Sequence, residues 1–302
     1  MSKTVSEKEK RERLGWIGAG HMGAPMAERL SQAGYALTVC GSGRRDLRPY
    51  AERIGAALAK DPTELAKEAD VIFTMIPDGK VLLSIADKLA EADLTGKVLV
   101  EMSTVDPDSS ARAAGIIGQA GGAMLRAPVT GSTGMAEKGT LGIMVSGAEE
   151  IYERCLPYLK VLGNRQTYLG GAEEARQMKI LINMLLGDEM QALSEALVIG
   201  KKLGLPWEKM LDLIADSAAG APLYSYKKEI LKSMDFKPSS SVFNQHKDMK
   251  MAVALAKSVG VDAPSAQITM RMYDELMERG MEQLDNIAVY LVNEFRNQTE
   301  TQ

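Results

Sequence analysis

The sequence has little cysteine and histidine, and it carries no excess of positive charge. Its two cysteines, Cys40 and Cys155, lie far apart without CxxC or Cys/His spacing, which argues against a disulfide framework or a metal site and favours a reducing cytosol. The net charge of -4 gives no electrostatic reason to expect nucleic acid as a partner. No apolar run approaches the ~20 residues of a membrane span, and residues 1–13 lack the apolar core of a secretory signal. We therefore expect a soluble cytoplasmic protein without membrane contact, beginning with a flexible arm over residues 1–13.

The composition is that of a globular enzyme. The chain has 302 residues, of which 45% are hydrophobic and 25% charged, enough for two domains and a sizeable core. The 19 methionines lie mostly at helical core spacings, where methionine is a flexible filler.

The pattern of hydrophobic residues changes near residue 171. Before it, short apolar segments alternate with helical patterns, which predicts a mostly parallel sheet covered on both faces, an α/β dinucleotide-binding (Rossmann-type) domain over residues 14–171. After it the patterns are helical, which predicts an all-α domain over residues 172–302 joined by one long helix over 172–203. The predicted strands span residues 14–17, 36–40, 71–76, 98–102, 123–127 and 141–146. We expect the substrate in the cleft between the two domains.

A glycine-rich segment follows the first predicted strand. Gly18, Gly20 and Gly23 form a G-x-G-x-x-G run directly before a helical pattern, and a second strand follows at residues 36–40. The first glycine permits a tight turn, the second lets the backbone approach a pyrophosphate, and the third lets the helix pack closely on the strand. The run therefore predicts a dinucleotide site that includes His21 and Met22.

Three further loops follow apolar strands. Pro77-Asp78, Ser103-Thr104 and residues 128–132 each come directly after a predicted strand. Ligands of open α/β sheets bind beyond the carboxyl ends of the strands. The last loop is rich in backbone N–H groups and hydroxyls suited to a small carboxylate, although such residues are also common in ordinary turns.

Lys179 and Asn183 are the candidate catalytic residues. They are spaced i and i+4, so they share a face of the long predicted helix in otherwise apolar surroundings. Hydride transfer between a nicotinamide and a carbonyl needs a group that gives or takes the alcohol proton, a role we assign to Lys179, with Asn183 orienting the substrate. The alternative is a lysine whose stem covers core while its amine reaches water. His21 and His246 are set aside, since neither has an evident orienting carboxylate.

The coenzyme preference is predicted from the end of the second strand. An NAD-binding protein usually has an acidic residue there, but the chain reads Cys40-Gly41-Ser42-Gly43-Arg44-Arg45 and has no acid before Asp46. Ser42 with Arg44 or Arg45 could bind a 2'-phosphate, so NADP(H) is favoured over NAD(H). The alternative is that both arginines are solvated loop charges.

Together these segments resemble the β-hydroxyacid dehydrogenase family over nearly the whole chain after residue 13. The matching motifs are Ile17 to Gly23 with Pro25-Met26-Ala27, Ser103-Thr104, Ala127 to Gly131, Lys179 with Asn183, and Lys247-Asp248. The resemblance implies that Thr104 and Lys247 contact the dinucleotide near its nicotinamide. Ile76 and Pro77 are also predicted to bind the dinucleotide. It also implies that Ser103, Thr130, Gly131, Ser132 and Asp248 serve the substrate, while Lys179 meets its reacting oxygen.

The resemblance also implies a small carboxylate substrate, a 3-hydroxy acid or its semialdehyde, and a homo-oligomer formed through the helical domain. The chain departs from the family at Arg126, where an acidic residue is usual, at Gly131-Ser132, where a glycine pair is usual, and at Ala19, where a leucine is usual. Two alternatives stay open: an imine reductase, which typically lacks the lysine, and an inactive nucleotide-binding scaffold.

Overall fold

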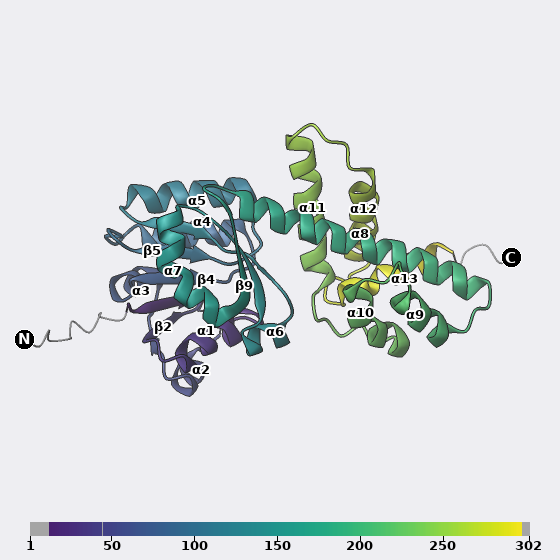
Figure 1. Cartoon of the computed structure of the whole chain (residues 1–302), viewed down its shortest axis with the longest axis horizontal. Helices are drawn as coiled ribbons and strands as arrows, with labels where there is room; N and C mark the ends of the chain where they lie inside the picture. The colour runs from purple at the N-terminus through teal and green to yellow at the C-terminus, as the bar shows by residue number, and fades with distance from the viewer. Residues whose placement is uncertain (1–11, 44, 298–302) are drawn as a thin grey trace, which may run out of the picture. The chain divides into compact units, whose positions relative to one another are not determined.

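The computed structural model describes residues 12–43 and 45–297. Within them, the first part of the chain forms one nine-stranded sheet (Figure 1). The strands are β1 Leu14–Ile17, β2 Leu37–Cys40, β3 Ala57–Leu58, β4 Val71–Thr74, β5 Val98–Glu101, β6 Ala123–Arg126, β7 Val129–Thr130, β8 Leu141–Ser146 and β9 Gly163–Gly170. Their order across the sheet is β3-β2-β1-β4-β5-β6-β8-β7, with β9 beside β8.

The first six strands run parallel, as predicted, in the order 3-2-1-4-5-6 of a doubly wound dinucleotide-binding sheet. Their carboxyl ends therefore share one edge, here called the carboxyl edge, and their amino ends share the opposite, amino edge. Strands β8 and β9 run the opposite way: β8 pairs antiparallel with β6, at Arg126 and Ser146, and with β7, while β9 pairs parallel with β8. The crevice beside β1 and β4, where the strand order reverses, lies at the carboxyl edge.

Both faces of the sheet are buried because alternate residues of each strand point to opposite sides. Trp16 and Phe73 stack 5.6 Å apart on the face covered by α1 Gly23–Gln32 and α7 Glu149–Leu162. Ile17 and Ile72 pack on the other face with α3 Pro62–Glu68, α4 Gly79–Leu89 and α5 Pro107–Gln119. The shorter helices are α2 Arg48–Arg53 and α6 Thr133–Lys138.

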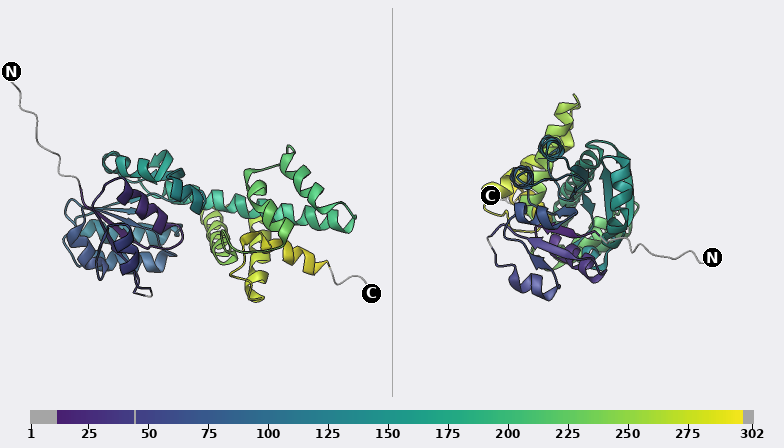
Figure 2. Two further views of the ribbon diagram at one scale, coloured as in Figure 1. Left: turned by 90° about the horizontal axis from the view of Figure 1, so that it is seen from below. Right: turned by 90° about the vertical axis from the view of Figure 1, so that its left-hand side faces the viewer.

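The second part of the described chain is helical, which confirms the predicted fold class (Figures 1 and 2). Its elements are α8 Glu174–Lys202, α9 Trp207–Asp216, α10 Pro222–Ser233, α11 Val242–Ser258, α12 Pro264–Glu278, the short helix η1 Asn286–Ala288, and α13 Val289–Arg296. A separate core of aliphatic side chains, methionines and Tyr273 holds these helices together. No described helix is long and apolar enough to cross a membrane.

The chain divides into two compact units, one ending at Lys179 and one beginning at Ile180. We call them the α/β unit and the helical unit. Helix α8 spans this division, so its first six residues belong to the α/β unit. The predicted domain boundary at 171/172 precedes α8. Of the predicted arm, residues 1–11 lie outside the described residues, whereas Glu12 and Arg13 bond to Tyr158 and Asp70.

Candidate active site

The glycine loop between β1 and α1 has the geometry that a pyrophosphate requires. Gly18 has φ +100°, and a Cβ there would lie 2.1 Å from the Met75 carbonyl oxygen. A Cβ at Gly23 would lie 2.0 Å from the Gly18 carbonyl oxygen, so only glycine lets α1 start this close to the loop. At Gly20, by contrast, a Cβ would meet nothing within 4 Å. Gly18 thus makes the tight turn, Gly20 leaves space for a ligand to approach the backbone, and Gly23 lets α1 contact the loop closely, an arrangement that fits a dinucleotide phosphate.

The amino end of α1 differs from those of α3, α4 and α5. Helices α3, α4 and α5 are each capped by an aspartate, Asp61, Asp78 and Asp106, whose carboxylate accepts from a first-turn N–H group. No described side chain caps α1, and its first turn has no acidic residue. Uncapped N–H groups and the positive end of the helix dipole favour an anionic ligand there.

The segment after β2 presents basic and hydroxyl groups to solvent. Ser42 and Arg45 are exposed, whereas Arg44 lies outside the described residues. The carboxylate of Asp46 accepts from Arg48 Nε at 3.0 Å and Nη2 at 2.8 Å, and this bonding lowers the pKa of Asp46. The first acid after β2 is therefore paired with an arginine of its own segment. Burial raises the pKa of the adjacent Cys40 thiol to about 11, so it is not a nucleophile at neutral pH.

Direct contacts join the loops of the carboxyl edge. The Ile76 N–H donates to Ser103 Oγ at 2.7 Å, which ties the loop after β4 to the loop after β5. Thr133 Oγ1 lies 3.8 Å from Met22 Sδ, which places the end of the loop after β6 beside the glycine loop. The predicted dinucleotide and substrate loops are thus neighbours within the α/β unit.

Individual residues of these loops are placed differently. Ser103 is 1% exposed and its hydroxyl accepts from Ile76, so its side chain holds the loops together and has no surface for a substrate. Thr104 is half-buried, and Pro77 is exposed. In the loop after β6, Thr130 pairs with Gly142 of β8, and the exposed Gly131 and Ser132 follow.

Lys179 ends the part of α8 that belongs to the α/β unit, and its side chain is half-buried. Three residues before it, Arg176 donates to the Ser103 carbonyl oxygen at 2.5 Å. Three helical residues rise about 4.5 Å, so the Lys179 backbone lies about one helical turn from a residue that bonds to the loop after β5. Strand β5 is the second strand from β1, roughly 10 Å across the sheet. Lys179 thus follows, by one turn of α8, an arginine bonded at the edge that carries the glycine loop.

Asn183 lies one turn further along α8, in the helical unit, where it is 7% exposed. Its Nδ2 donates to Asp248 Oδ2 at 2.5 Å, and its carbonyl oxygen accepts from Gln245 Nε2 at 2.9 Å. Lys247 Nζ lies 3.5 Å from Asp248 Oδ1. The structure thus brings Asn183 together with the Lys247-Asp248 motif, although Asn183 and Asp248 are 65 residues apart in the sequence. Their contacts with coenzyme and substrate stay predictions.

His246, set aside for lack of an evident orienting carboxylate, lies beside one. Its Nε2 lies 2.7 Å from Asp274 Oδ1 on α12, 28 residues later in the chain. This pair was not predictable from local spacing, because the two residues come from different helices. The pair lies in the helical unit, on α11 and α12.

Two buried ion pairs at the carboxyl edge were missed from the sequence. Arg176 pairs with Glu101 at the end of β5, and Arg126 pairs with Glu173 before α8. Arg126 was noted only as a departure from the family. The available signal was that Glu101 and Arg126 each end an apolar strand, VLVE and AMLR, in a sheet predicted to be covered on both faces.

Comparisons with known proteins identify the family of the chain. Residues 13–170 match the NAD-binding domain of 6-phosphogluconate dehydrogenase, and residues 174–292 match the NAD-binding domain of NADP-dependent 3-hydroxyisobutyrate dehydrogenase. Glyoxylate/succinic semialdehyde reductase 1 of Arabidopsis thaliana is 32% identical over 281 residues, 91% of this chain and 96% of the relative. The 2-hydroxy-3-oxopropionate reductase of Escherichia coli is 29% identical over 283 residues, 92% of this chain and 95% of the relative.

A solved structure shows the same architecture. The 3-hydroxyisobutyrate dehydrogenase of Mycobacterium tuberculosis, solved with L-serine, superposes with a TM-score of 0.84 at 26% identity, covering 93% of this chain and 98% of that one. Two family models account for most of the chain, and the two relatives align with 91% and 92% of it. The chain belongs to the β-hydroxyacid dehydrogenase family of NAD(P)-dependent oxidoreductases.

Proposed function

We propose that the protein is an NADP-dependent oxidoreductase that interconverts a small 3-hydroxy acid and its semialdehyde, with Lys179 as general acid and base. The observation that carries the proposal is the presence in one unit of an open phosphate cradle at Gly20 and a lysine held at the same sheet edge. A bound nicotinamide dinucleotide supplies or accepts the hydride at the carbonyl carbon. In the reducing direction, the Lys179 ammonium gives a proton to the oxygen that becomes the hydroxyl. In the oxidising direction, the neutral amine takes that proton back.

The remaining site residues bind and orient. We assign the substrate carboxylate to the N–H groups and hydroxyls of residues 130–132, and orientation of the substrate to Asn183, one turn beyond Lys179. The names of the relatives from Arabidopsis and Escherichia coli describe small aldehydes that carry a carboxylate, which is the substrate class proposed here. Exposed Ser42 and Arg45 after β2, with Asp46 bonded to Arg48, support a 2'-phosphate and hence NADP(H).

The test is a substrate panel with NADPH and with NADH. It contains glyoxylate, succinic, methylmalonate and tartronate semialdehydes, and cyclic imines. We expect kcat/KM to be highest for one of the carboxylate aldehydes and at least several-fold higher with NADPH than with NADH. Cyclic imines reduced far better than every aldehyde would establish an imine reductase instead. Binding of NADPH without turnover of any panel member would establish a nucleotide-binding scaffold.

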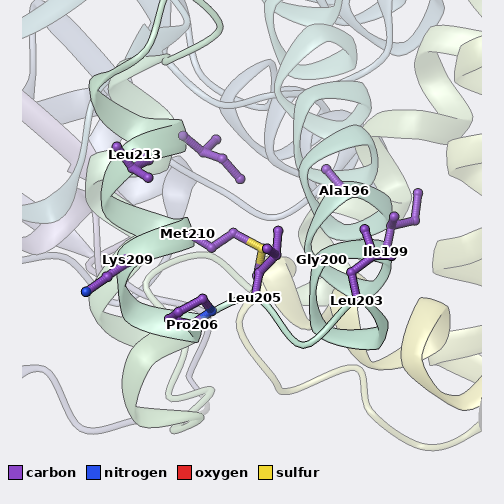
Figure 3. Close-up of a pocket in the computed structure, with 10 residues that line it drawn as sticks. Ala196, Ile199, Gly200, Leu203, Leu205, Pro206, Lys209, Met210 and Leu213 are labelled. Carbon is purple, nitrogen blue, oxygen red and sulfur yellow. The ribbon is translucent and has the colours of Figure 1, made fainter.

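We also propose that the helical unit carries a homo-oligomer interface. An apolar hollow of about 570 Å³ lies where the end of α8 meets α9, with the Met210 side chain lying between the two helices (Figure 3). At this hollow, Leu203 is 72% and Leu213 is 71% exposed. Light scattering should show a dimer or tetramer, and Leu203→Lys with Leu213→Lys should reduce the assembled fraction; an unchanged assembly would place the interface elsewhere.

A further inference from the structure

Two strands of the sheet end in a buried charge at the carboxyl edge. Glu101, the last residue of β5, is 0% exposed, and Arg126, the last residue of β6, is 9% exposed. Removing a charge from water is costly unless the charge is paired and hydrogen-bonded. Both charges find their partners at the start of α8 or directly before it.

The inner pair is built around Arg176, which is 1% exposed. Its Nη2 pairs with the Glu101 carboxylate, Nη1 donates to the Ser103 carbonyl oxygen at 2.5 Å, and Nε donates to Ser110 Oγ at 3.2 Å. Glu101 Oε1 also accepts from the Ser103 N–H at 2.9 Å. One guanidinium thus joins α8 to β5, to the loop after β5, and to α5.

Two further ties hold the same end of α8. Arg126 Nε donates to Glu173 Oε1 at 2.7 Å, one residue before the helix begins. Ser146 Oγ, at the end of β8, accepts from the Ala175 N–H at 3.2 Å and donates to the Ala172 carbonyl oxygen at 2.8 Å. The first turn of α8 is therefore fixed to β5, β6 and β8 at once.

We propose that Arg176 and Glu101, with Arg126 and Glu173, are positioning residues that fix the first turn of α8 and thereby hold Lys179 at the carboxyl edge. The catalytic half of this inference rests on the proposed function. Lys179 lies three residues, about 4.5 Å of helix rise, beyond Arg176. A shift of one turn or a small rotation of α8 would move the amine by ångströms, and a misplacement of about 1 Å can lower a rate about 100-fold.

Stability alone is a weak reason for this arrangement. A buried ion pair replaced by apolar residues of similar volume is often no less stable. What apolar residues do not reproduce is the planar fork of donors that reaches three partners in fixed directions. The geometry points to orientation of the helix as the purpose of the fork.

The first test removes both buried charges of the inner pair. The double variant Arg176→Met with Glu101→Gln keeps an acceptor for the Ser103 N–H and leaves no unpaired charge. We expect amide hydrogen exchange over residues 174–182 to rise at least about tenfold, since exchange reports local opening. We expect kcat to fall about 10- to 100-fold, while the Kd for NADPH stays within threefold. Unchanged exchange, or faster exchange with unchanged kcat, would overturn the proposal.

Two single variants make the test specific. Arg176→Lys keeps the charge but loses the fork, so it should lower kcat nearly as much as the double variant, and full activity would overturn the role of the fork. Glu173→Gln is a milder change, because this side chain is 13% exposed, and it keeps the proposal testable if the double variant does not fold. It should lower kcat about threefold to tenfold. A kcat equal to that of the wild type would overturn the positioning role of the Arg126–Glu173 pair.

The control is an arginine at the opposite edge. Arg154 on α7 also joins a carboxylate and a carbonyl oxygen, those of Glu12 and Gly96, at the amino edge. Arg154→Met should lower the melting temperature and leave kcat and α8 exchange unchanged. If the wild type reduces no member of the substrate panel, the proposed function fails separately. The positioning role of Arg176 and Glu101 is then tested by amide hydrogen exchange over residues 174–182 and by the rate at which an amine reagent labels Lys179. Equal rates in wild type and the double variant would overturn it.

Discussion

The two edges of the sheet use the same chemistry with different consequences. At the amino edge, Arg154 bonds to Glu12 at 2.6 Å and to the Gly96 carbonyl oxygen at 2.8 Å, while the Tyr158 hydroxyl donates to Glu12 at 2.5 Å. The Arg154 and Glu12 side chains are 30% and 28% exposed, so water screens the pair. At the carboxyl edge, the Arg176 and Glu101 side chains are 1% and 0% exposed.

The difference separates stability from function. A partly exposed ion pair contributes about 0 to 1 kcal/mol to stability. The Arg154 pair joins α7 to Glu12 and Gly96, and none of these carries a residue of the proposed active site. Removing one partner of a buried pair costs about 3–5 kcal/mol, and the carboxyl-edge pairs hold the loops and the helix of the proposed active site. Changes at the amino edge should therefore affect stability alone, whereas changes at the carboxyl edge should affect ligand binding or turnover.

The largest contrast is expected between two glycines. Gly18→Ala puts a methyl group 2.1 Å from the Met75 carbonyl oxygen at φ +100°, so the glycine loop must move. We expect the Kd for NADPH to rise more than about 100-fold, since the phosphate N–H groups lose their alignment. Fluorescence titration measures it.

The matched control for this change is at the amino edge. Gly96 has φ +72° but open space around a Cβ, so Gly96→Ala should cost only about 1–2 kcal/mol of unfolding free energy and leave NADPH binding unchanged. Equal NADPH affinities for the two variants would remove the distinction between the edges.

A smaller effect is expected at the end of β2. Arg45→Ala should raise KM for NADPH about tenfold and leave KM for NADH unchanged, because only the 2'-phosphate loses a charged partner. The control is Arg53→Ala on the nearby α2, which removes the ion pair between Arg53 and Glu28 of α1 and should change neither KM value. A parallel rise in both KM values for Arg45→Ala would contradict a 2'-phosphate role.

At the amino edge, Tyr158→Phe deletes the hydroxyl that donates to Glu12. We expect a loss of about 1 kcal/mol in the free energy of unfolding and no change in kcat. Urea denaturation and steady-state kinetics measure the two quantities. A fall in kcat of more than threefold would show that the two edges are coupled.

The smallest effect is a dependence of stability on pH. Burial pushes the pKa of Asp70 upward, but hydrogen bonds from Arg13 outweigh it and hold that pKa below its usual value. A lowered pKa contributes stability above the unfolded pKa of about 3.9, and this contribution is lost as pH falls through and below it. The Arg13 and Asp70 side chains are 46% and 34% exposed, so their ion pair contributes at most about 1 kcal/mol to the free energy of unfolding. Asp70→Asn should therefore cost this amount at about pH 6 and less at about pH 3; an equal cost at both values would contradict the assignment.

Much of the fold follows from the sequence because strong local patterns coincide with buried elements. Strands β1 and β8 begin and end at the predicted residues, and α8 differs from its predicted range by two residues at its start and one at its end. Strand β9 was missed because GNRQTYLG has little apolar character, and its partner β8 supplies the bonding. The two-residue strands β3 and β7 were also missed.

The site was predictable where its signal is local. The glycine spacing identifies the phosphate cradle, and the i, i+4 spacing identifies Lys179 and Asn183 on one helix. The ties that hold α8 were not predictable, since Glu101 and Arg176 are 75 residues apart and Arg126 and Glu173 are 47 apart. For Ser103, the motif predicted a substrate contact, but a long-range bond to Ile76 buries its hydroxyl.

The most direct measurement for the whole account is kcat of Lys179→Ala on the best aldehyde of the panel with saturating NADPH. The control is Lys202→Ala, an exposed lysine at the other end of the same helix. The account predicts that kcat falls about 10²- to 10⁴-fold for Lys179→Ala, with the NADPH Kd within threefold of wild type, and that Lys202→Ala retains full activity. A Lys179→Ala enzyme within tenfold of wild-type kcat would contradict it.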